Sequence, residues 1–278
     1  MADMGPKVSF VTVCYRTPGL VRQLLKGFEA ASPSFPYEFF LVDNGDDGTG
    51  AMVRERFPWV SVIAGQGNIG FGAGNNRAFR LAAGEYVMLM NPDLTVFPGE
   101  MEKLVSYADA NPTAGLIGPR LVNPDRSAQR TFHRFPNTFI PIYRRTAIGR
   151  TSWGQRAVDR YFMLEADASK VQDVDGLFGA AVLIRRAALE RIGHFDERFF
   201  MYFEDVDLCR RAWESGWRVV YAPVAEFVHY HQRESEVKRL WNLAYNRTAR
   251  EHIKSGVKYF LKYRGKGHPR EATMNNER

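Results

Sequence analysis

The sequence predicts an α/β protein built on a mostly parallel β-sheet with helices on both faces. Short apolar segments rich in β-branched residues alternate with amphipathic helical segments from residue 7 to about residue 120. The apolar segments are nearly continuous, which is typical of parallel strands buried on both faces. The chain has 278 residues, 45% apolar and 25% charged, a balance typical of a globular protein that buries a large core.

Turn residues and apolar spacing divide the first part of the chain into elements. Strands are expected at residues 7–14, 38–42, 60–64 and 86–90. Helices are expected at residues 20–31, 52–57 and 75–83, and a glycine-rich loop at 65–74. The first helix is the clearest, because its leucine and phenylalanine residues recur at helical spacing.

The pattern is looser after Gly118. Residues 123–172 mix arginine, aromatic residues and proline without a clear period, and we interpret them as a solvated excursion with some helix. Beyond it we expect helices at 182–192 and 204–216, an aromatic run at 199–203 and a short strand at 219–221. Residues 237–263 predict a long basic amphipathic helix or helix pair.

Composition excludes several classes of protein. No run of about 18 uncharged apolar residues is present, so a membrane-spanning helix is not expected. No basic segment followed by an apolar one opens the chain, so we expect no signal peptide. With only Cys14 and Cys209, neither a disulfide scaffold nor a four-cysteine zinc site is possible, and a reducing cytoplasm is the expected compartment.

The net charge of +7 belongs to the end of the chain. Residues 237–278 hold 11 basic and 3 acidic residues, whereas residues 1–236 have a net charge of −1. A nucleic-acid enzyme would spread positive charge around its cleft, so we expect no nucleic-acid partner. The basic, aromatic-rich tail suits an anionic membrane surface; the alternative is a charged helix packed on the rest of the protein.

Three polar residues follow predicted strands. Tyr15 follows the first, Asp43 ends the second, and Asp93 follows the fourth in the sequence Asn91-Pro92-Asp93. Because ligands of parallel sheets bind beyond the carboxyl ends of the strands, we expect these side chains to converge on a nucleotide-type site. A carboxylate at such a position suits Mg²⁺ or Mn²⁺ shared with substrate phosphates, although Asp93 could equally cap a helix.

Two further clusters are candidates for chemistry. Glu204-Asp205-Val206-Asp207 places carboxylates at a helix N-terminus beside an aromatic run, where a partly dry environment suits a general base; plain helix capping is the alternative. His229 and His231 share one face of a strand, so either could bind an ion, or both could be ordinary structural histidines. The loop at 65–76 only loosely resembles a phosphate-binding loop, and it lacks the Lys-Ser/Thr ending of a P-loop.

Taken in order, these motifs resemble glycosyltransferase family 2, and within it the rhamnosyltransferase-like enzymes of polysaccharide synthesis. The matching segments are VSFVTVCY at 8–15, VDNG at 42–45, NIGFGAGNN at 68–76, GEYVMLMNPD at 84–93, DGLFGAAVLIR at 175–185, GHFDERFFMYFEDVDLCR at 193–210 and HYHQRES at 229–235. The resemblance implies the GT-A fold, a Rossmann-like and mostly parallel sheet. It implies a catalytic domain at 1–236, with a nucleotide-binding half at about 7–120 and an acceptor half at about 121–236, followed by a basic helical extension at 237–278.

The resemblance also assigns roles to individual residues. Asp205 falls at the position of the catalytic base, and Asp93 and His229 at metal-ligand positions, with His231 as the weaker alternative for the histidine. The residues at positions that contact the nucleotide or donor are Tyr15, Asp43, Asn68, Asn76, Asn91 and Asp175. Asn91 replaces the first residue of the family's Asp-x-Asp motif, which removes one negative charge from the site.

The implied activity is that of an inverting, metal-dependent glycosyltransferase using Mg²⁺ or Mn²⁺. It would move rhamnose from dTDP-rhamnose to a hydroxyl of a glycan or polyprenyl-linked acceptor, as a peripheral protein at the cytoplasmic face of the membrane. Two alternatives remain at this point: an enzyme of the same fold with a UDP-hexose donor, and a catalytically silent relative that binds nucleotide sugar or glycan. Joint retention of Asp43, Asp93, Asp205 and His229 argues against the silent relative.

Overall fold

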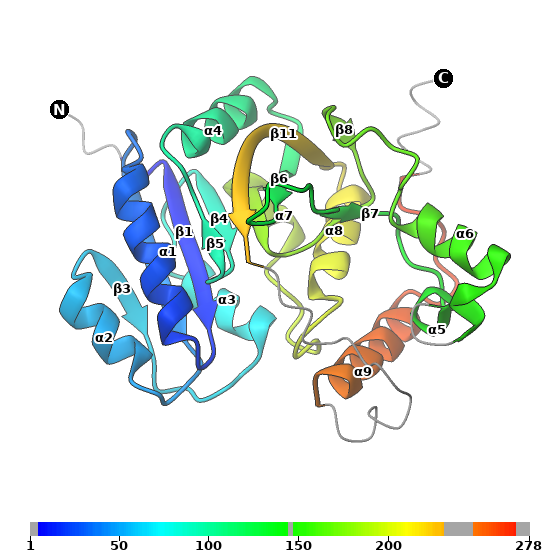
Figure 1. The fold of residues 1–278 in the computed structure, drawn as a ribbon, viewed down its shortest axis with the longest axis horizontal. Helices are drawn as coiled ribbons and strands as arrows, with labels where there is room; N and C mark the ends of the chain where they lie inside the picture. Colours follow the sequence, from blue (N-terminus) through cyan, green and yellow to red (C-terminus); the bar gives the residue numbers. More distant parts are fainter. Residues whose placement is uncertain (1–4, 144–146, 231–246, 271–278) are drawn as a thin grey trace.

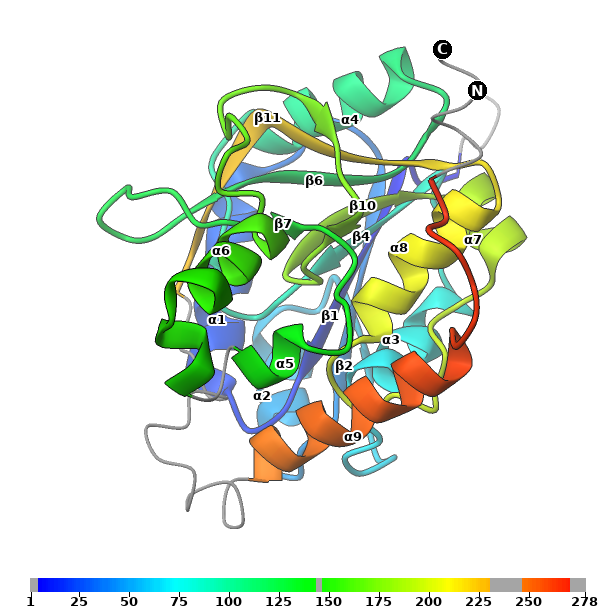
Figure 2. The same ribbon diagram turned by 90° about the vertical axis from the view of Figure 1, so that its right-hand side faces the viewer.

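The computed structural model describes residues 5–143, 147–230 and 247–270. It is an α/β protein in which one nine-stranded sheet runs through the molecule between two layers of helices (Figures 1 and 2). The strand order is β3-β2-β1-β4-β10-β6-β11-β5, with β8 paired to β11. The predicted fold class is therefore confirmed.

The first half of the sheet is parallel. Its strands are β1 (Val8–Cys14), β2 (Tyr37–Asp43), β3 (Val60–Ile63) and β4 (Tyr86–Met90), and its helices are α1 (Pro18–Ala31), α2 (Thr49–Arg56) and α3 (Phe71–Phe79). All four strands begin and end within about one residue of the predicted bounds. This agreement arises because buried parallel strands are marked by unbroken apolar runs that end at polar turn residues.

The second half contains antiparallel pairs. It comprises β5 (Leu94–Thr95), α4 (Glu100–Ala110), β6 (Ala114–Val122), β7 (Phe132–His133), α5 (Ile140–Tyr143), a 3₁₀ turn (Ala147–Arg150), α6 (Ser152–Tyr161), β8 (Gln172–Asp173), β9 (Gly176–Leu177), β10 (Ala181–Arg185), α7 (Arg186–Ile192), α8 (Glu204–Glu214), β11 (Arg218–His229) and α9 (Arg247–Lys262). Strand β10 lies between β4 and β6 and runs antiparallel to both. The short strands β7 and β9 form a separate two-stranded sheet.

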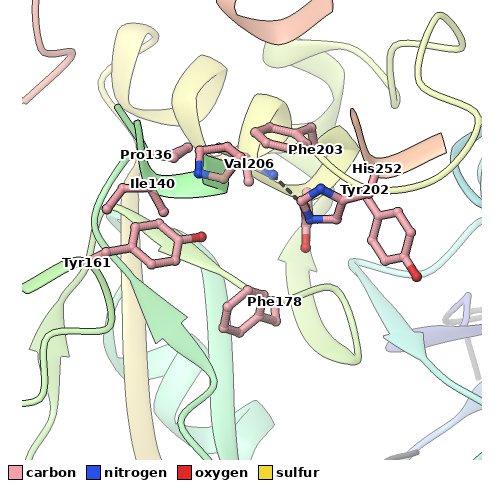
Figure 3. Close-up of a pocket in the computed structure, with 10 residues that line it drawn as sticks. Pro136, Ile140, Tyr161, Phe178, Tyr202, Phe203, Val206 and His252 are labelled. Carbon is pink, nitrogen blue, oxygen red and sulfur yellow. Dashed lines mark hydrogen bonds between the residues drawn. The ribbon is translucent and has the colours of Figure 1, made fainter. Parts of the chain in front are cut away.

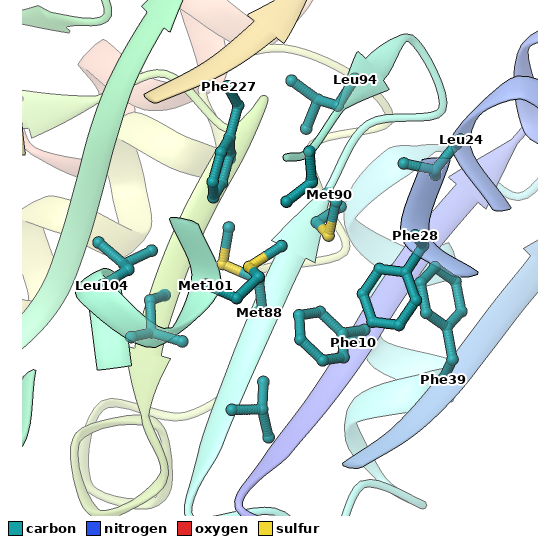
Figure 4. Packing of buried hydrophobic residues seen from close by; sticks show 14 of the residues in the cluster. Phe10, Leu24, Phe28, Phe39, Met88, Met90, Leu94, Met101, Leu104 and Phe227 are labelled. Atoms are coloured by element: carbon teal, nitrogen blue, oxygen red, sulfur yellow. The ribbon is translucent and has the colours of Figure 1, made fainter. Parts of the chain in front are cut away.

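Alternate side chains of the central strands pack into separate cores on the two faces of the sheet. Phe10, Phe39 and Met88 pack against α1 and α4 on one face (Figure 4). On the other face, Val87 and Leu89 belong to a cluster that includes residues of α3, α7 and α8. The two-residue period of a strand therefore explains the unbroken apolar runs, because every position faces one core or the other.

Three predicted elements differ from the structure. Helix α3 begins at Phe71, inside the predicted loop, rather than at residue 75. The predicted helix at 182–192 is wrong in its first part, because Ala181–Arg185 forms β10 and only Arg186–Ile192 is helical. The strand predicted at 219–221 extends over Arg218–His229.

Helix α9 packs on the rest of the protein through one face. Tyr259 and Tyr263 form an aromatic cluster with Phe199 and Phe203, which lie before α8. The buried carboxylate of Asp207 accepts hydrogen bonds from the Tyr263 hydroxyl at 2.8 Å and from the Lys262 ammonium at 2.5 Å. The predicted helix thus exists over 247–262, while residues 237–246 lie outside the described part of the chain. None of the described helices is long and apolar enough to cross a membrane.

Gly70, directly before α3, lies against Phe200 of the second half of the chain, so a substitution at Gly70 tests this contact. Its φ of +92° and ψ of 175° lie in a region that is essentially restricted to glycine, and an added Cβ would lie 2.3 Å from the carbonyl oxygen of Phe200. We expect Gly70→Ala to lower the free energy of unfolding by about 3 kcal/mol, measured by urea denaturation.

Gly19→Ala is the matched control. Gly19 lies in the first turn of α1 with no atom within 4 Å of an added Cβ, so alanine should leave the free energy of unfolding unchanged or raise it by up to about 1 kcal/mol. Equal destabilisation by both substitutions would contradict this account of Gly70.

Candidate active site

The candidate site lies where β1, β2 and β4 end. Cys14 and Asp43 are paired at the ends of β1 and β2, and the backbone N–H of Asn44 donates to the Cys14 carbonyl at 2.9 Å. Tyr15 follows with 43% of its surface exposed, and the Arg16 guanidinium lies 5.3 Å from its ring centroid. An exposed aromatic face next to a buried carboxylate is an arrangement that can stack a base and accept from its ring N–H.

Asp43 is held rigidly by the backbone. One carboxylate oxygen accepts from the N–H of Gly45 at 2.9 Å, and the other accepts from the N–H of Gly50 at 2.8 Å. Gly50 allows this close approach, since an added Cβ would lie 3.0 Å from Asp43 Oδ2. The carboxylate is buried but retains acceptor capacity, because each oxygen can accept more than one hydrogen bond.

Two residues that the resemblance places at the sugar-nucleotide donor, Asn68 and Asn76, lie just before α3 and within it. The exposed Asn68 accepts from the Gly70 N–H at 3.1 Å, which fixes the turn before the helix. Asn76 is buried: its amide nitrogen donates to Phe195 O and Glu197 Oε1, each at 2.9 Å, and its oxygen accepts from the Phe195 N–H at 3.0 Å. The Asn76 side chain therefore joins α3 to the segment that leads to α8.

Asp93 and His229 face each other. Oδ2 of Asp93 lies 3.2 Å from Nε2 of His229, and the backbone N–H of Tyr230 donates to the Asp93 carbonyl at 2.9 Å. Both side chains are largely buried. The antiparallel pairing of β5 with the end of β11 produces this contact, because it brings Leu94 opposite His229. His231 lies outside the described residues.

Gln129 determines that Nδ1 of the His229 ring carries a hydrogen. Its amide nitrogen donates to the carbonyl oxygens of Asn123 (side chain) and His229 (backbone) at 2.7 and 2.8 Å, so its own oxygen is the atom that faces His229 Nδ1 at 2.8 Å. Nδ1 must then be the donor. In a neutral imidazole, the lone pair of Nε2 consequently points toward the Asp93 carboxylate.

This pair fits a divalent cation. Two acceptors, Nε2 and a carboxylate oxygen, lie in contact, and Asp93 Oδ1 is a buried atom with no hydrogen-bond donor in the described part of the chain. A cation between them would satisfy both groups, and Gln129 would act as the outer hydrogen-bond partner that orients a ligating histidine. No three His, Cys, Asp or Glu side chains gather into a metal site in the described ranges. Substrate phosphate and water are ligands that could complete the coordination of such a cation.

Asp205 lies at the first turn of α8. Its Oδ2 accepts from the N–H of Gly179 at 3.1 Å. The carbonyl oxygen of Ala180, the residue after Gly179, accepts from the N–H of Asn91 at 2.8 Å. The segment 179–180 therefore holds Asp205 close to the end of β4. Burial raises the pKa of Asp205, and this effect exceeds the lowering by His133 and by backbone N–H donors.

Glu204, the residue before Asp205, is a second carboxylate at the start of α8. Its side chain is buried, and its Oε2 has no hydrogen-bond partner among the described residues. Burial and the neighbouring charges of Asp205 and Asp207 raise its pKa well above the usual value. The pKa values of both carboxylates are therefore raised, because burial and the neighbouring negative charges oppose ionisation of the pair.

A small pocket of about 60 Å³ opens above Asp205. Figure 3 shows Pro136, Ile140 and Tyr161 on one side and Tyr202 and His252 on the other. The remaining lining residues are Pro141, Phe178, Phe203, Asp205 and Val206. The pocket thus combines an apolar, aromatic wall with one carboxylate, which suits a sugar ring whose hydroxyl group meets the carboxylate.

The turn that delivers Asp205 is strained. Tyr202 and Phe203 have φ values of 69° and 68°, in the left-handed region that non-glycine residues rarely adopt. Helix α9 braces this turn: Ser255 Oγ donates to the Met201 carbonyl at 2.9 Å, and Tyr259 packs against Phe203. Strain of this kind persists only where surrounding structure fixes the conformation.

Asp175, expected from the resemblance at the donor or acceptor pocket, contacts the segment that follows α9. Its oxygens accept from the Phe135 N–H at 2.9 Å and from Arg270 at 2.9 Å, and His268 Nε2 lies 3.1 Å away. Burial alone would raise the pKa of Asp175, but these partners outweigh it and lower the pKa to about 2. These contacts join the segment around Phe135 and the segment after α9 to the strand region that carries Asp175.

Comparison with known proteins is consistent with this geometry. The sequence model of the family described as "Glycosyltransferase like family 2" matches residues 6–252. The chain belongs to this family.

The curated relatives of this glycosyltransferase include rhamnosyltransferases. The N-acetylglucosaminyl-diphospho-decaprenol L-rhamnosyltransferase of Mycobacterium tuberculosis is 33% identical over 242 residues, which cover 83% of this chain and 77% of the relative. Rhamnosyltransferase WbbL of Escherichia coli is 23% identical over 92% of this chain and 94% of the relative.

Solved glycosyltransferases share the fold. A mannosyltransferase from Pyrobaculum calidifontis, solved with GDP-Man and Mn²⁺, aligns over 99% of this chain and 70% of that chain with a TM-score of 0.61 and 20% identity. GalNAc-T7, solved with UDP, GalNAc and Mn²⁺, aligns over 82% of this chain and 43% of that chain with a TM-score of 0.60 and 13% identity. The GT-A fold expected from the sequence is confirmed.

The Asp175 contacts predict a pH-dependent contribution to the stability of this glycosyltransferase. Because the folded-state pKa of about 2 lies below the ordinary value of 3.8, the contribution is present in full above about pH 4 and is lost as the pH falls toward 2. We expect Asp175→Asn to lower the free energy of unfolding by about 2 kcal/mol at pH 7, and the difference from the wild type to shrink toward pH 2.

Urea denaturation at several pH values measures this difference. Glu55→Gln is the control, because Glu55 is an exposed carboxylate of α2 with no side-chain ion pair among the described residues. A pH-independent difference for Asp175→Asn would contradict the ionic origin of the stabilisation.

Proposed function

We propose that this glycosyltransferase moves rhamnose from dTDP-rhamnose to a hydroxyl of a polyprenyl-diphosphate-linked sugar, with inversion at the anomeric carbon. The observation that carries the proposal is Asp205: a carboxylate with a raised pKa at the base of an aromatic pocket, tied by residues 179–180 to the strand edge that carries Asn91 and Asp93. The printed activity of the relative from Mycobacterium tuberculosis supports this choice of sugar and acceptor.

The donor would lie across the ends of β1, β2 and β4. Tyr15 offers a face for the nucleobase, and Asp43, held by the N–H groups of Gly45 and Gly50, offers an acceptor for its ring N–H. Asn91 would hydrogen-bond the ribose or a metal-bound water. Asp93 and His229 would hold Mg²⁺ or Mn²⁺, which neutralises the charge of the departing diphosphate.

Asp205 supplies the proton acceptor. As the acceptor hydroxyl oxygen bonds to the anomeric carbon, the bond from that carbon to the diphosphate oxygen breaks, and the hydroxyl proton moves to Asp205. The nucleotide diphosphate leaves from the opposite side, so a single displacement inverts the configuration. The raised pKa strengthens Asp205 as a base, because a carboxylate with a higher pKa holds the proton more firmly.

The same proposal sets the place of the reaction. A polyprenyl-linked acceptor is confined to a membrane, while the sugar nucleotide is dissolved in the cytoplasm. We therefore propose a cytoplasmic enzyme that works at the inner face of the cell membrane as a peripheral protein.

Asp205→Asn tests the base. Amide substitution keeps the shape but removes the proton acceptor, so transfer should fall by about 10³-fold while the dissociation constant for the nucleotide diphosphate changes little. In the wild type, kcat/KM should decline toward acid pH with an apparent pKa above 3.8, because the base is lost on protonation and burial raises its pKa. Asp159→Asn, on the exposed side of α6, is the control, and near-normal transfer by Asp205→Asn would rule out Asp205 as the base.

Nucleotide specificity and metal use are tested together by calorimetry with dTDP, UDP and GDP, each with and without Mn²⁺ or Mg²⁺. We expect dTDP to bind most tightly, and more tightly with the ion. Selective binding of UDP would indicate that the donor is a UDP-hexose and not dTDP-rhamnose. Absence of binding to all three by the folded protein would favour the silent relative.

Gln129→Leu tests the metal pair. Loss of the amide leaves His229 Nδ1 without its acceptor, so the apparent affinity for Mn²⁺ in the presence of dTDP should fall about 10–100-fold. Calorimetric titration with Mn²⁺ measures this without turnover. Gln155→Leu, which changes a glutamine of α6 that contacts Asp159, should bind Mn²⁺ as the wild type does, and an unchanged affinity in Gln129→Leu would contradict the orienting role.

A further inference from the structure

The outward face of α9 carries an apolar stripe. Ile253, Val257 and Leu261 follow one another at intervals of four residues, so they lie along one side of the helix. Their exposed fractions are 40%, 54% and 65%, whereas Tyr259 and Tyr263 on the opposite side are buried against the catalytic domain. The helix is therefore apolar on two faces, and only one of them packs against the domain.

Cations run along one flank of this stripe. Arg250, Lys254 and Lys258 are exposed at the same four-residue interval, and α9 as a whole has five basic residues and one acidic residue, Glu251. Lys254 pairs with Glu251 at 2.8 Å, an exposed i,i+3 contact of small energy. Each ammonium has three donors, so these contacts leave capacity for an anionic ligand.

A shallow groove continues the basic flank. It is lined by Arg198, Lys258, Leu261 and Lys262, so three cations surround the most exposed residue of the stripe. Asp196 pairs with Arg198 and Lys262, and Lys262 also pairs with the buried Asp207, so two carboxylates face the three cations. The groove therefore combines excess positive charge with an apolar side chain, a combination that suits a phosphate headgroup above acyl chains.

We propose that the outward face of α9 docks on an anionic lipid bilayer, with Ile253, Val257 and Leu261 entering the headgroup region and Arg250, Lys254 and Lys258 contacting lipid phosphates. Charge complementarity favours a bilayer over an apolar protein partner, because the cations lie in a row beside the stripe. A helix with one apolar side and a flanking row of lysine and arginine is typical of helices that lie in the membrane interface.

Docking on this face would bring the acceptor pocket to within one helix diameter, about 10 Å, of the bilayer. His252 lines the pocket from the inner side of α9, and Ser255 on the same side holds the turn before Asp205. One helix thus joins the lipid surface to the pocket. This consequence rests on the proposed function, since only a lipid-linked acceptor gains from it.

Sedimentation of the full chain with phosphatidylcholine vesicles, with and without phosphatidylglycerol, tests the inference. The wild type should sediment with the anionic vesicles and less with the neutral ones. Ile253→Ser, Val257→Ser and Leu261→Ser combined should weaken binding more than about tenfold. Arg250→Gln with Lys254→Gln should weaken it by about fivefold for each cation removed, and added salt should reduce that difference.

Matched controls remove similar groups elsewhere. Leu81→Ser removes a side chain that is 59% exposed, and Arg22→Gln removes an exposed cation of α1; both should bind vesicles as the wild type does. Failure of the wild type to bind anionic vesicles, or equal binding by the wild type and both α9 variants, would overturn the inference.

Transfer assays separate this inference from the proposed function. With a water-soluble acceptor that lacks the polyprenyl chain, the α9 variants should match the wild type, whereas with acceptor embedded in anionic vesicles they should be slower. Wild-type protein that binds vesicles but transfers sugar to neither acceptor would refute the proposed function and leave the docking face intact. Wild-type protein that transfers sugar to the soluble acceptor but binds no vesicles would refute the docking face and leave the proposed function intact.

Discussion

Two backbone hydrogen bonds made by neighbouring residues hold the site together. The N–H of Gly179 donates to the Asp205 carboxylate, and the carbonyl of Ala180 accepts from the N–H of Asn91. These residues directly precede β10, the antiparallel strand inserted between β4 and β6. The insertion brings the second half of the chain to the edge where the parallel strands end. Without it, the candidate base and the candidate metal ligands would belong to separate parts of the molecule.

The groups that surround a carboxylate decide whether it stabilises the fold as an ion pair or can act as a base. Asp175 is buried but meets Arg270, His268 and a backbone N–H, so its pKa is lowered to about 2 and it acts as an ionic anchor. Asp205 is half-buried, and its hydrogen-bond donors among the described residues are backbone N–H groups, so the burial raises its pKa. The difference follows from the partners, since burial opposes ionisation in both cases. A carboxylate with cationic partners is a poor base, whereas one held only by N–H groups can still accept a proton.

Helix α9 joins three features that are separate in the sequence. Its inner face supplies Tyr259 and Tyr263 to an aromatic cluster and braces the strained turn at Tyr202 and Phe203. Its last residue, Lys262, and Tyr263 directly after it satisfy the fully buried Asp207 of α8. The conformation of the turn before Asp205 therefore depends on a helix that lies more than 40 residues later in the sequence. The two sequence alternatives for this segment, packing on the domain and contact with a membrane, concern opposite faces of one helix and are compatible.

Unbroken apolar runs ending at polar turn residues were sufficient to predict the parallel strands, their order along the chain and the polar residues at their ends, because such strands are specified locally by burial on both faces. Residues 181–185 could not be assigned from sequence: AVLIR runs directly into the helical RAALERI, and only pairing with β4 and β6 makes it a strand. Gln129, which orients His229 across a separation of 100 residues, carries no local signal, and Asn76 and Asp175 owe their contacts to segments distant in the chain. Local burial thus determines which residues lie at the edge of the sheet. Long-range packing determines which atoms they contact there, because their partners come from segments that are brought near only when the whole chain folds.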